Sequence, residues 1–428
     1  MKRTRIATMG FRADFKLLFK RILLFFVLNV SLLEGILVAQ ENEVTSVEGI
    51  FYLDNTPVVV EIDRGVIRKI VRNRQSDASK GKWIVAPGLI DNQINGCLSV
   101  GFATPDLTVE GVRKVARALW KTGVTTFLPT LVTNSHDRFM ENLTVLAKAI
   151  QEPDLARSIP GFHLEGPYIS AVDGFRGSHP KPWVRPPDWK EFLEWNRAAG
   201  GNILQITLAP ETEGAMDFIR NCASQGIVVG LGHHNGTASQ ITQAVDCGAA
   251  ISTHLGNGCA NTIHRHDNPL WPQLAEDRLL ASIIVDGFHL RPEEVQVFFK
   301  TKTVERLVLT SDMAEMAGMP PGQYIQNEQT VTITPEGMIQ VASQNVLAGA
   351  SMPLNRGVAN IMNYTGCSLA DAIHMASRNP ARLYRLEDRG EIQSGKRADL
   401  VLFSMDGEGI HIRQTVVAGK VVFSSDTK

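Results

Sequence analysis

The sequence predicts an α/β protein, a (β/α)8 TIM-like barrel with a small β-sandwich domain built from the N- and C-terminal segments. Three observations lead to this prediction. Eight apolar, β-branched runs alternate with helix-like segments, which is typical of a parallel barrel. Short strand patterns flank this region on both sides. The length of 428 residues also accommodates a large barrel and a satellite domain.

Each of the eight predicted barrel strands is an apolar run that ends in polar residues. The runs cover residues 83–91, 125–132, 159–166, 203–210, 227–234, 250–257, 280–287 and 306–313. Helices are predicted between them over residues 108–122, 136–151, 188–199, 215–224, 237–247 and 292–302. Two of these helices begin with capping-box spacing, at Asp188-x-x-Glu191 and at Thr237-x-x-Gln240.

The alternation of strands and helices changes after Asp312. Beyond it the sequence predicts a hairpin, two helices and two further strands, over residues 329–334 with 338–341, 355–364, 368–377, 400–403 and 415–423. Residues 58–71 alternate as short strands near the other end of the chain. We therefore expect residues 45–80 and 385–428 to form the small β domain, and residues 81–384 to form the barrel.

The composition is that of an ordinary globular enzyme and excludes some partners. The chain has 44% hydrophobic and 20% charged residues, and its 43 Lys and Arg against 44 Asp and Glu give a net charge of −1. Nucleic acid is not expected as a partner, because binding it requires a basic surplus or patch. The five cysteines are scattered and odd in number, so they indicate buried small side chains and no disulfide framework.

Residues 1–44 have the pattern of a secretory signal. Residues 1–21 are rich in Lys and Arg, and an apolar run follows over 22–30. Glu34 interrupts the apolar character, and Leu37 is larger than a signal cleavage site prefers. There are two alternatives to a signal. One is a membrane-spanning helix, which needs about 20 apolar residues, and the other is a start codon placed too far upstream; the sequence leaves the choice open.

Polar residues gather at the ends of the predicted strands, where barrel enzymes have their active sites. Glu165, His233 and His254 follow three of the runs. One glutamate and two histidines form a good open set of ligands for a catalytic Zn²⁺. Asp312, at the end of the last run, is then free for proton transfer. A single such histidine is more often structural, but several on one barrel face with two carboxylates indicate metal-assisted amide hydrolysis.

A series of short motifs follows the predicted strands along the chain. They are Ala86-Pro87-Gly88-Leu89-Ile90-Asp91, His163-Leu164-Glu165-Gly166-Pro167, Gly232-His233-His234-Asn235, Thr253-His254-Leu255, Asp286-Gly287-Phe288-His289, Leu309-Thr310-Ser311-Asp312, Leu347-Ala348-Gly349-Ala350-Ser351 and Asn379-Pro380-Ala381-Arg382. In these motifs and in their order the chain resembles the N-acetylglucosamine-6-phosphate deacetylases of the amidohydrolase superfamily, over about residues 48–423. The resemblance implies deacetylation of N-acetylglucosamine 6-phosphate to glucosamine 6-phosphate and acetate by a cytoplasmic enzyme. The signal-like segment leaves export or membrane anchoring open.

The first strand distinguishes this chain from amidohydrolases that bind two metals. Many superfamily members carry His-x-His there, whereas this chain has Gln93-x-Asn95, and neither amide is a good ligand for Zn²⁺. The departure agrees with the single-metal members of the deacetylase family. We expect one divalent metal ion, with Zn²⁺ as the preferred ion; Gln93 and Asn95 acting only as strand caps would leave that expectation unchanged.

The resemblance also implies how the substrate is bound. His179 would contact the acetyl carbonyl and stabilise the oxyanion. Asn257, Gly258, Arg265 and His289 would bind the amino-sugar phosphate, with Arg265 and His289 on the phosphate, in a homodimer whose subunits share these contacts. The segment 257–271 departs from the common family pattern, and Arg265 pairing with Asp267 on the surface is the alternative.

Two other functions remain open on the sequence. One is a related amidohydrolase that acts on another N-acyl substrate, such as a different acetamido sugar or an N-acyl amino acid. The other is a non-catalytic relative that serves as an assembly scaffold. Proteins of the second kind usually lose metal ligands, whereas this chain keeps Glu165, His233, His254 and Asp312.

Overall fold

The computed structural model describes residues 44–72, 83–326, 329–341, 346–407 and 409–426. The signal-like segment predicted over residues 1–44 lies outside this part except for Val44. The cytoplasmic location implied by the resemblance therefore stays a prediction. Within the described ranges, no helix combines the length and the apolar character that crossing a membrane requires.

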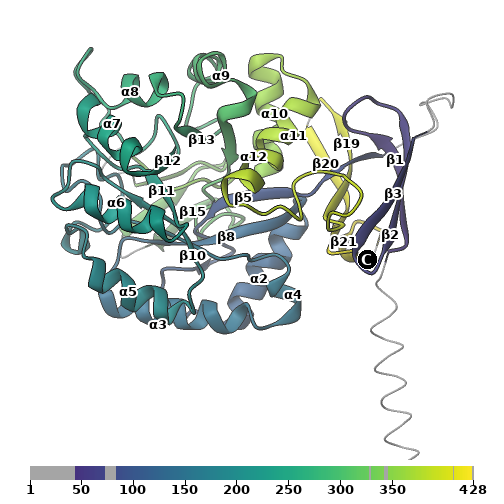
Figure 1. Cartoon of the computed structure of the whole chain (residues 1–428), viewed down its shortest axis with the longest axis horizontal. Coiled ribbons are helices and arrows are strands. Elements are labelled where there is room, and N and C mark those ends of the chain that lie inside the picture. Colours follow the sequence, from purple (N-terminus) through teal and green to yellow (C-terminus); the bar gives the residue numbers. More distant parts are fainter. Residues whose placement is uncertain (1–43, 73–82, 327–328, 342–345, 408, 427–428) are drawn as a thin grey trace, which may run out of the picture. The chain divides into compact units, whose positions relative to one another are not determined.

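Eight parallel strands form the barrel, which confirms the predicted fold class (Figure 1). In sheet order they are β5 (Leu89–Ile94), β8 (Val124–Val132), β9 (Phe162–Glu165), β10 (Ile203–Leu208), β11 (Val228–Leu231), β12 (Ala249–Ser252), β13 (Leu280–Ile284) and β14 (Leu307–Thr310). A parallel bridge between Ile94 and Met313 brings the first and last strands together. The strands are buried on both faces, as their continuous apolar runs require.

Helices connect consecutive barrel strands and lie around them (Figure 1). They are α2 (Val109–Trp120), α3 (His136–Ala149), α4 (Pro153–Ala156), α5 (Trp189–Ala198), α6 (Ala215–Ser224), α7 (Ala238–Cys247), α8 (Leu270–Ala275) and α9 (Pro292–Arg306). The capping box predicted at Thr237 is present. At Asp188 the side chain caps α5 by accepting from the backbone N–H groups of Lys190 and Glu191.

A four-stranded antiparallel sheet follows the barrel, where the sequence predicted only a hairpin. It consists of β15 (Gly322–Gln326), β16 (Gln329–Ile333), β17 (Ile339–Val341) and β18 (Val346–Leu347). Its apolar residues pack against Ala314 and Met316, just beyond β14. The helices α10 (Leu354–Thr365), α11 (Leu369–Met375) and α12 (Arg378–Leu383) then complete the region after the barrel.

The N- and C-terminal segments build one seven-stranded sheet, which gives the predicted separate β domain. Its strands, in sheet order, are β21 (Lys420–Ser424), β20 (Gly409–Val417), β19 (Leu400–Asp406), β4 (Ile84–Pro87), β1 (Ser46–Phe51), β2 (Pro57–Asp63) and β3 (Val66–Arg72). The strand predicted over 415–423 is two strands, because Ala418 and Gly419 have positive φ and turn the chain. The boundaries predicted for the domains stay a prediction.

The run 83–91 was predicted as one barrel strand, and this was wrong. The structure divides it at Pro87–Gly88 into β4 of the seven-stranded sheet and β5 of the barrel. Pro87 ends β4, and the N–H of Gly88 donates to the carbonyl oxygen of Asp399 at 2.9 Å. A run of apolar residues cannot reveal such a change of sheet, because both strands are buried.

Candidate active site

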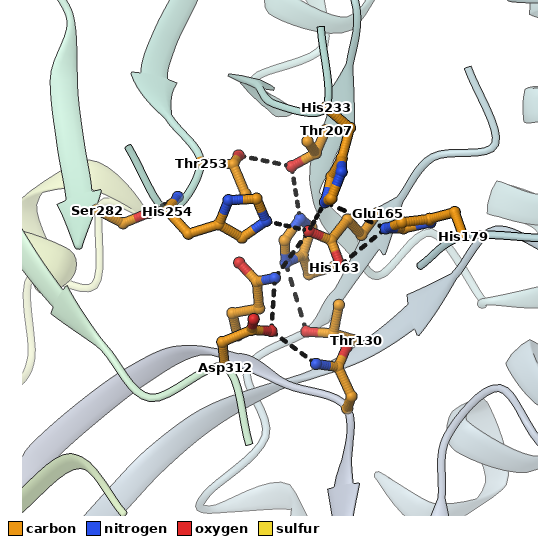
Figure 2. A network of polar contacts seen from close by, with 12 residues as sticks. Thr130, His163, Glu165, His179, Thr207, His233, Thr253, His254, Ser282 and Asp312 are labelled. Atoms are coloured by element: carbon orange, nitrogen blue, oxygen red, sulfur yellow. Dashed lines mark hydrogen bonds and ion pairs between the residues drawn. The ribbon is translucent and has the colours of Figure 1, made fainter. Parts of the chain in front are cut away.

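Polar side chains from several strand ends meet on one face of the barrel (Figure 2). Glu165 is the last residue of β9, and His233 and His254 each follow the end of β11 and β12 by two residues. Asp312 follows the end of β14 by two residues. All four side chains are buried, and no more than 9% of each residue is exposed. The structure therefore brings together the four residues that were predicted to carry the chemistry.

Three of these residues have a left-handed backbone conformation. The φ angles are 50° at His233, 34° at His254 and 53° at Asp312. Positive φ is uncommon for residues other than glycine and costs energy that the surrounding structure must supply. Such strain gathers at functional sites, because it turns a side chain into a direction that a regular strand does not offer.

Glu165 lies between imidazole rings in a geometry that fits a metal ion (Figure 2). Its Oε1 is 2.7 Å from Nε2 of His254 and 3.4 Å from Nε2 of His233. One ligand atom from each of the three residues lies within 4.8 Å of the others. Nδ1 of His233 lies 3.2 Å from the carbonyl oxygen of Phe175, which would accept a hydrogen bond from Nδ1 when Nε2 binds a metal ion. A glutamate and two histidines fit one divalent cation with an open coordination position.

The charges at this centre follow from burial and close contact. Burial raises the pKa of Glu165, but hydrogen bonds from His233 and His254 outweigh it and hold that pKa well below its usual range. For His254 burial acts to lower the pKa, but the carboxylate of Glu165 raises it. Burial, with the nearby Glu165, raises the pKa of Asp312 to about 6. A carboxyl with a pKa near neutrality suits proton transfer.

Two amide side chains hold the carboxylates in place, a role that the sequence reasoning missed. Nε2 of Gln93 donates to Oε1 of Glu165 and to Oδ1 of Asp312, both at 2.9 Å. Nδ2 of Asn95 donates to the same Oδ1 at 2.7 Å. The sequence signal was their spacing, because residues two apart on a strand point to one face. Gln93 and Asn95 thus do more than cap the strand.

His179 reaches the same centre from a loop. Its Nε2 lies 3.2 Å from Nε2 of His233 and 3.9 Å from Oε2 of Glu165 (Figure 2). Burial and the neighbouring His233 lower the pKa of His179 to about 3, so the ring is neutral. The hydroxyl of Thr133, 2.8 Å from Nδ1, can donate to that nitrogen. The proton of His179 is then on Nε2 and points into the site.

A cavity of about 1080 Å³ opens over this centre, and three of the predicted substrate-binding residues line it. Nδ2 of Asn257 is buried there without a hydrogen-bond partner among the described residues. Gly258 has a φ of 65°, and a methyl group on it would lie 3.0 Å from Nδ1 of His233. Nδ1 of His289 is 2.8 Å from Oδ2 of Asp286, which orients the ring. Arg265 is exposed on a loop and stands outside the residues that line the cavity.

The barrel, the buried glutamate and histidines and the adjacent aspartate together define a metal-dependent hydrolase of the amidohydrolase class. Residues 84–422 match the amidohydrolase family, and the chain belongs to this family. It is 32% identical over 346 residues to the N-acetylglucosamine-6-phosphate deacetylase of Bacillus subtilis. The aligned region covers 80% of this chain and 85% of that protein.

Two further comparisons point to the same group of amidohydrolases. The N-acetylgalactosamine-6-phosphate deacetylase of Escherichia coli O157:H7 is 30% identical over 363 residues, covering 85% of this chain and 94% of that protein. A solved structure of a mutant N-acetyl-D-glucosamine-6-phosphate deacetylase from Mycobacterium smegmatis, in complex with N-acetyl-D-glucosamine 6-phosphate, matches with a TM-score of 0.79 and 26% identity. That match covers 89% of this chain and all of the other. The resemblance seen in the sequence motifs is thus confirmed.

Proposed function

We propose that this chain hydrolyses the acetamide of N-acetylglucosamine 6-phosphate and releases glucosamine 6-phosphate and acetate. The observation that carries the proposal is the meeting of Glu165, His233 and His254 with Asp312 under one cavity. Similarity to deacetylases of amino-sugar phosphates over at least 80% of the chain supports the choice of substrate.

The metal ion is proposed to be a single Zn²⁺ held by Glu165, His233 and His254. Bound there, it would polarise the acetyl carbonyl and lower the pKa of the attacking water. One glutamate and two histidines match the preference of Zn²⁺ for a catalytic site with an open position. Gln93, where two-metal amidohydrolases carry a histidine, donates hydrogen bonds to carboxylates. The amide oxygen of Gln93 is a poor ligand for Zn²⁺, so we expect no second metal ion at β5.

Asp312 is proposed as the residue that moves the proton. As water attacks the acetyl carbon, Oδ2 of Asp312 accepts its proton while Oδ1 stays bonded to Gln93 and Asn95. His179 donates from Nε2 to the carbonyl oxygen as negative charge develops on it. Asp312 then gives the proton to the departing amine, and the C–N bond breaks to leave acetate and the free amino sugar.

The phosphate is proposed to bind on the wall that carries Asn257, Gly258 and His289. The free Nδ2 of Asn257 is a donor aimed into the cavity, and a buried donor without a partner is costly unless a ligand completes it. Arg265 is exposed, so its proposed contact with the phosphate requires a second subunit, in a homodimer that shares the site. A surface ion pair with Asp267 is the alternative for Arg265.

A panel of acetamido sugars tests the substrate. The protein would be loaded with Zn²⁺ and incubated with N-acetylglucosamine and N-acetylgalactosamine, each with and without a 6-phosphate, and acetate would be measured. The proposal expects the highest kcat/KM on N-acetylglucosamine 6-phosphate. A preference for the galactosamine epimer would assign the chain to the other deacetylase that it resembles. Equal rates with and without phosphate would remove the phosphate from the proposal.

A further inference from the structure

A carboxylate that has no partner among the described residues lies in the wall of the active-site cavity. Glu315 follows Asp312 by three residues and lines the cavity, yet only 9% of it is exposed. Its backbone carbonyl accepts from the N–H of Ser99 at 2.8 Å, which fixes the main chain. In the described part of the chain its carboxylate has no hydrogen bond and no ion pair. A buried carboxylate left in this state is costly.

A second free acceptor belongs to the same cavity. Gln326, the last residue of β15, donates from Nε2 to the carbonyl oxygen of Ala348 at 3.1 Å. This bond orients the amide, and its Oε1 is buried without a partner among the described residues. Gln326, Ala348 and Glu315 all line the cavity. We call Glu315 and Gln326 the acceptor wall.

Gly101 makes room for the carboxylate of Glu315. A methyl group at position 101 would lie 2.4 Å from Oε2 of Glu315, so any larger residue would displace that oxygen. Gly101 also lines the cavity. The carboxylate therefore lies against a residue that also lines the cavity.

We propose that the acceptor wall binds hydroxyl groups of the sugar ring and that Glu315 determines which sugars are accepted. The inference rests on the proposed function and adds to it the part of the substrate that these residues contact. The carboxylate of Glu315 and Oε1 of Gln326 accept hydrogen bonds, and sugar hydroxyls can donate them. A hydroxyl donating to a carboxylate forms a strong, charge-assisted hydrogen bond.

The acceptor wall also orients the substrate. A phosphate dianion carries only acceptors, and above the raised pKa of Glu315, about 7, the carboxylate repels it, so the phosphate is not expected against Glu315. The donor Nδ2 of Asn257 lines the same cavity and suits the anion. With the acetamide at Glu165, His233 and His254, the acceptor wall would contact the hydroxyl groups and the wall that carries Asn257 would contact the phosphate. The sugar would then bind in a single orientation.

The test combines variants with substrates that lack single hydroxyls. Glu315→Gln keeps the shape and removes the charge, Glu315→Ala removes the whole group, and Gln326→Leu removes the second acceptor. Each would be assayed on N-acetylglucosamine 6-phosphate, its C4 epimer and its 1-, 3- and 4-deoxy analogues. Glu48→Gln is a matched control, because Glu48 is an exposed glutamate in β1 and does not line the cavity.

We expect the effect of replacing Glu315 on kcat/KM to depend on one hydroxyl group of the sugar. Glu315→Ala should lower kcat/KM on the parent substrate by about tenfold or more, mainly through KM, because a hydrogen bond to a charged group is lost. On the analogue that lacks the hydroxyl bound by Glu315, wild type and variant should have equal kcat/KM. Gly101→Ala should weaken binding of the same substrates, since it displaces the carboxylate.

Two outcomes would count against the inference, and they are distinguishable from each other. The acceptor wall would have no role in specificity if Glu315→Gln and Glu315→Ala each left kcat/KM unchanged. The same conclusion would follow if each variant reduced kcat/KM by a factor that is the same for every analogue. If the wild-type protein released no acetate from any of these sugars, the proposed function would fail and this inference would fail with it.

Discussion

At the scale of single residues, the site depends on side chains that hold other side chains. Gln93 donates to both Glu165 and Asp312, so one amide fixes the distance between a predicted metal ligand and the predicted base. Partners of this kind set the orientation and basicity of the groups that they contact. The activity of Asp312 should therefore depend on residues that never touch the substrate.

Replacing Gln93 tests this dependence. Gln93→Leu removes both hydrogen bonds at similar volume, and we expect kcat to fall by about 10- to 100-fold, as for other residues that support metal ligands. Asn95→Leu should have a smaller effect on metal affinity, because Asn95 contacts Asp312 only. Kinetics and metal titration of both variants measure the difference. Equal metal affinity in Gln93→Leu and wild type would show that the contact with Glu165 does not matter.

Asp312→Asn tests the proton transfer. The amide keeps the shape of the side chain but cannot accept and return a proton, so kcat should fall by at least ~10²-fold. Metal content should stay unchanged, because Asp312 is outside the proposed set of ligands. Near-normal turnover would remove Asp312 from the chemistry, and loss of metal would make it a ligand.

Glu315 gives a prediction on stability and pH. Burial raises its pKa from 4.5 to about 7, so the folded state binds this proton more tightly than the unfolded state. The contribution of this group to the free energy of unfolding is then greatest below about pH 4.5. It decreases by ~3 kcal/mol as the pH rises through the folded-state pKa. Glu315→Gln should therefore be more stable than wild type at pH 8, with the difference disappearing near pH 5.

Denaturant unfolding at the two pH values measures the effect of Glu315. The control Glu48→Gln changes the same charge at an exposed position, so its stability relative to wild type should not depend on pH in this way. A constant difference between Glu315→Gln and wild type across the range would mean that the carboxylate is paired or hydrated in solution.

Residues at the strand ends could be located from the sequence, and their supporting partners could not. Parallel strands bring their carboxyl ends to one face, so Glu165, His233, His254 and Asp312 were expected together, and they are. The roles of these four residues stay predictions. Gln93 was considered only as a missing ligand or a strand cap, because its two hydrogen bonds depend on groups 72 and 219 residues away.

At the scale of elements, the change of sheet at Gly88 links the seven-stranded sheet to the barrel. A methyl group on Gly88 would lie 2.2 Å from two side-chain atoms of Thr125 in β8. The N–H of the next residue, Leu89, donates to the carbonyl oxygen of Gly123 at 3.0 Å. Gly88 thus fixes the start of β5 close to β8. It lies six residues before Ile94, whose bridge to Met313 joins the first and last barrel strands.

Gly88→Ala should destabilise the protein by about 1–3 kcal/mol, the usual cost of overpacking a buried site. Gly407→Ala is a suitable control, because a methyl group there meets nothing within 4 Å. Thermal unfolding of the two variants, compared with wild type, measures the difference. Equal unfolding temperatures for the two variants would show that β5 and β8 adjust without cost.

The elements with strong periodicity could be predicted, and the irregular ones could not. The capping box at Thr237 and the buried runs gave helices and strands close to those observed. The four-stranded sheet was predicted as a hairpin, because β18 has only two residues and β15 has no buried residue, so neither strand gives an apolar pattern. Glu315 was not recognised as a cavity residue, because the cavity that it lines is formed in part by Gln326 and Ala348, whose positions the sequence did not reveal.

At the scale of the whole molecule, one metal ion would join several strands of the barrel. Glu165, His233 and His254 come from β9 and from the ends of β11 and β12, and their charges face each other in a buried space. A ligand that binds only the folded state stabilises it in proportion to its affinity and concentration. Metal binding and the stability of the barrel are therefore coupled.

Removing the metal should lower the unfolding temperature. A metal present at a thousand times its Kd would contribute ~4 kcal/mol, so treatment with a chelator should cause a clear loss that added Zn²⁺ reverses. His254→Ala should be insensitive to the chelator, because the set of ligands is incomplete. The same chelator effect in His254→Ala and wild type would locate the stabilising metal elsewhere.

The central claim is that this barrel uses one metal ion to remove the acetyl group from an amino-sugar phosphate. Metal content and acetate release, measured on the same purified protein with N-acetylglucosamine 6-phosphate, test it most directly. The account predicts about one equivalent of divalent metal and equal amounts of acetate and glucosamine 6-phosphate. Two tightly bound metals, or a metal-loaded protein that releases no acetate, would contradict it.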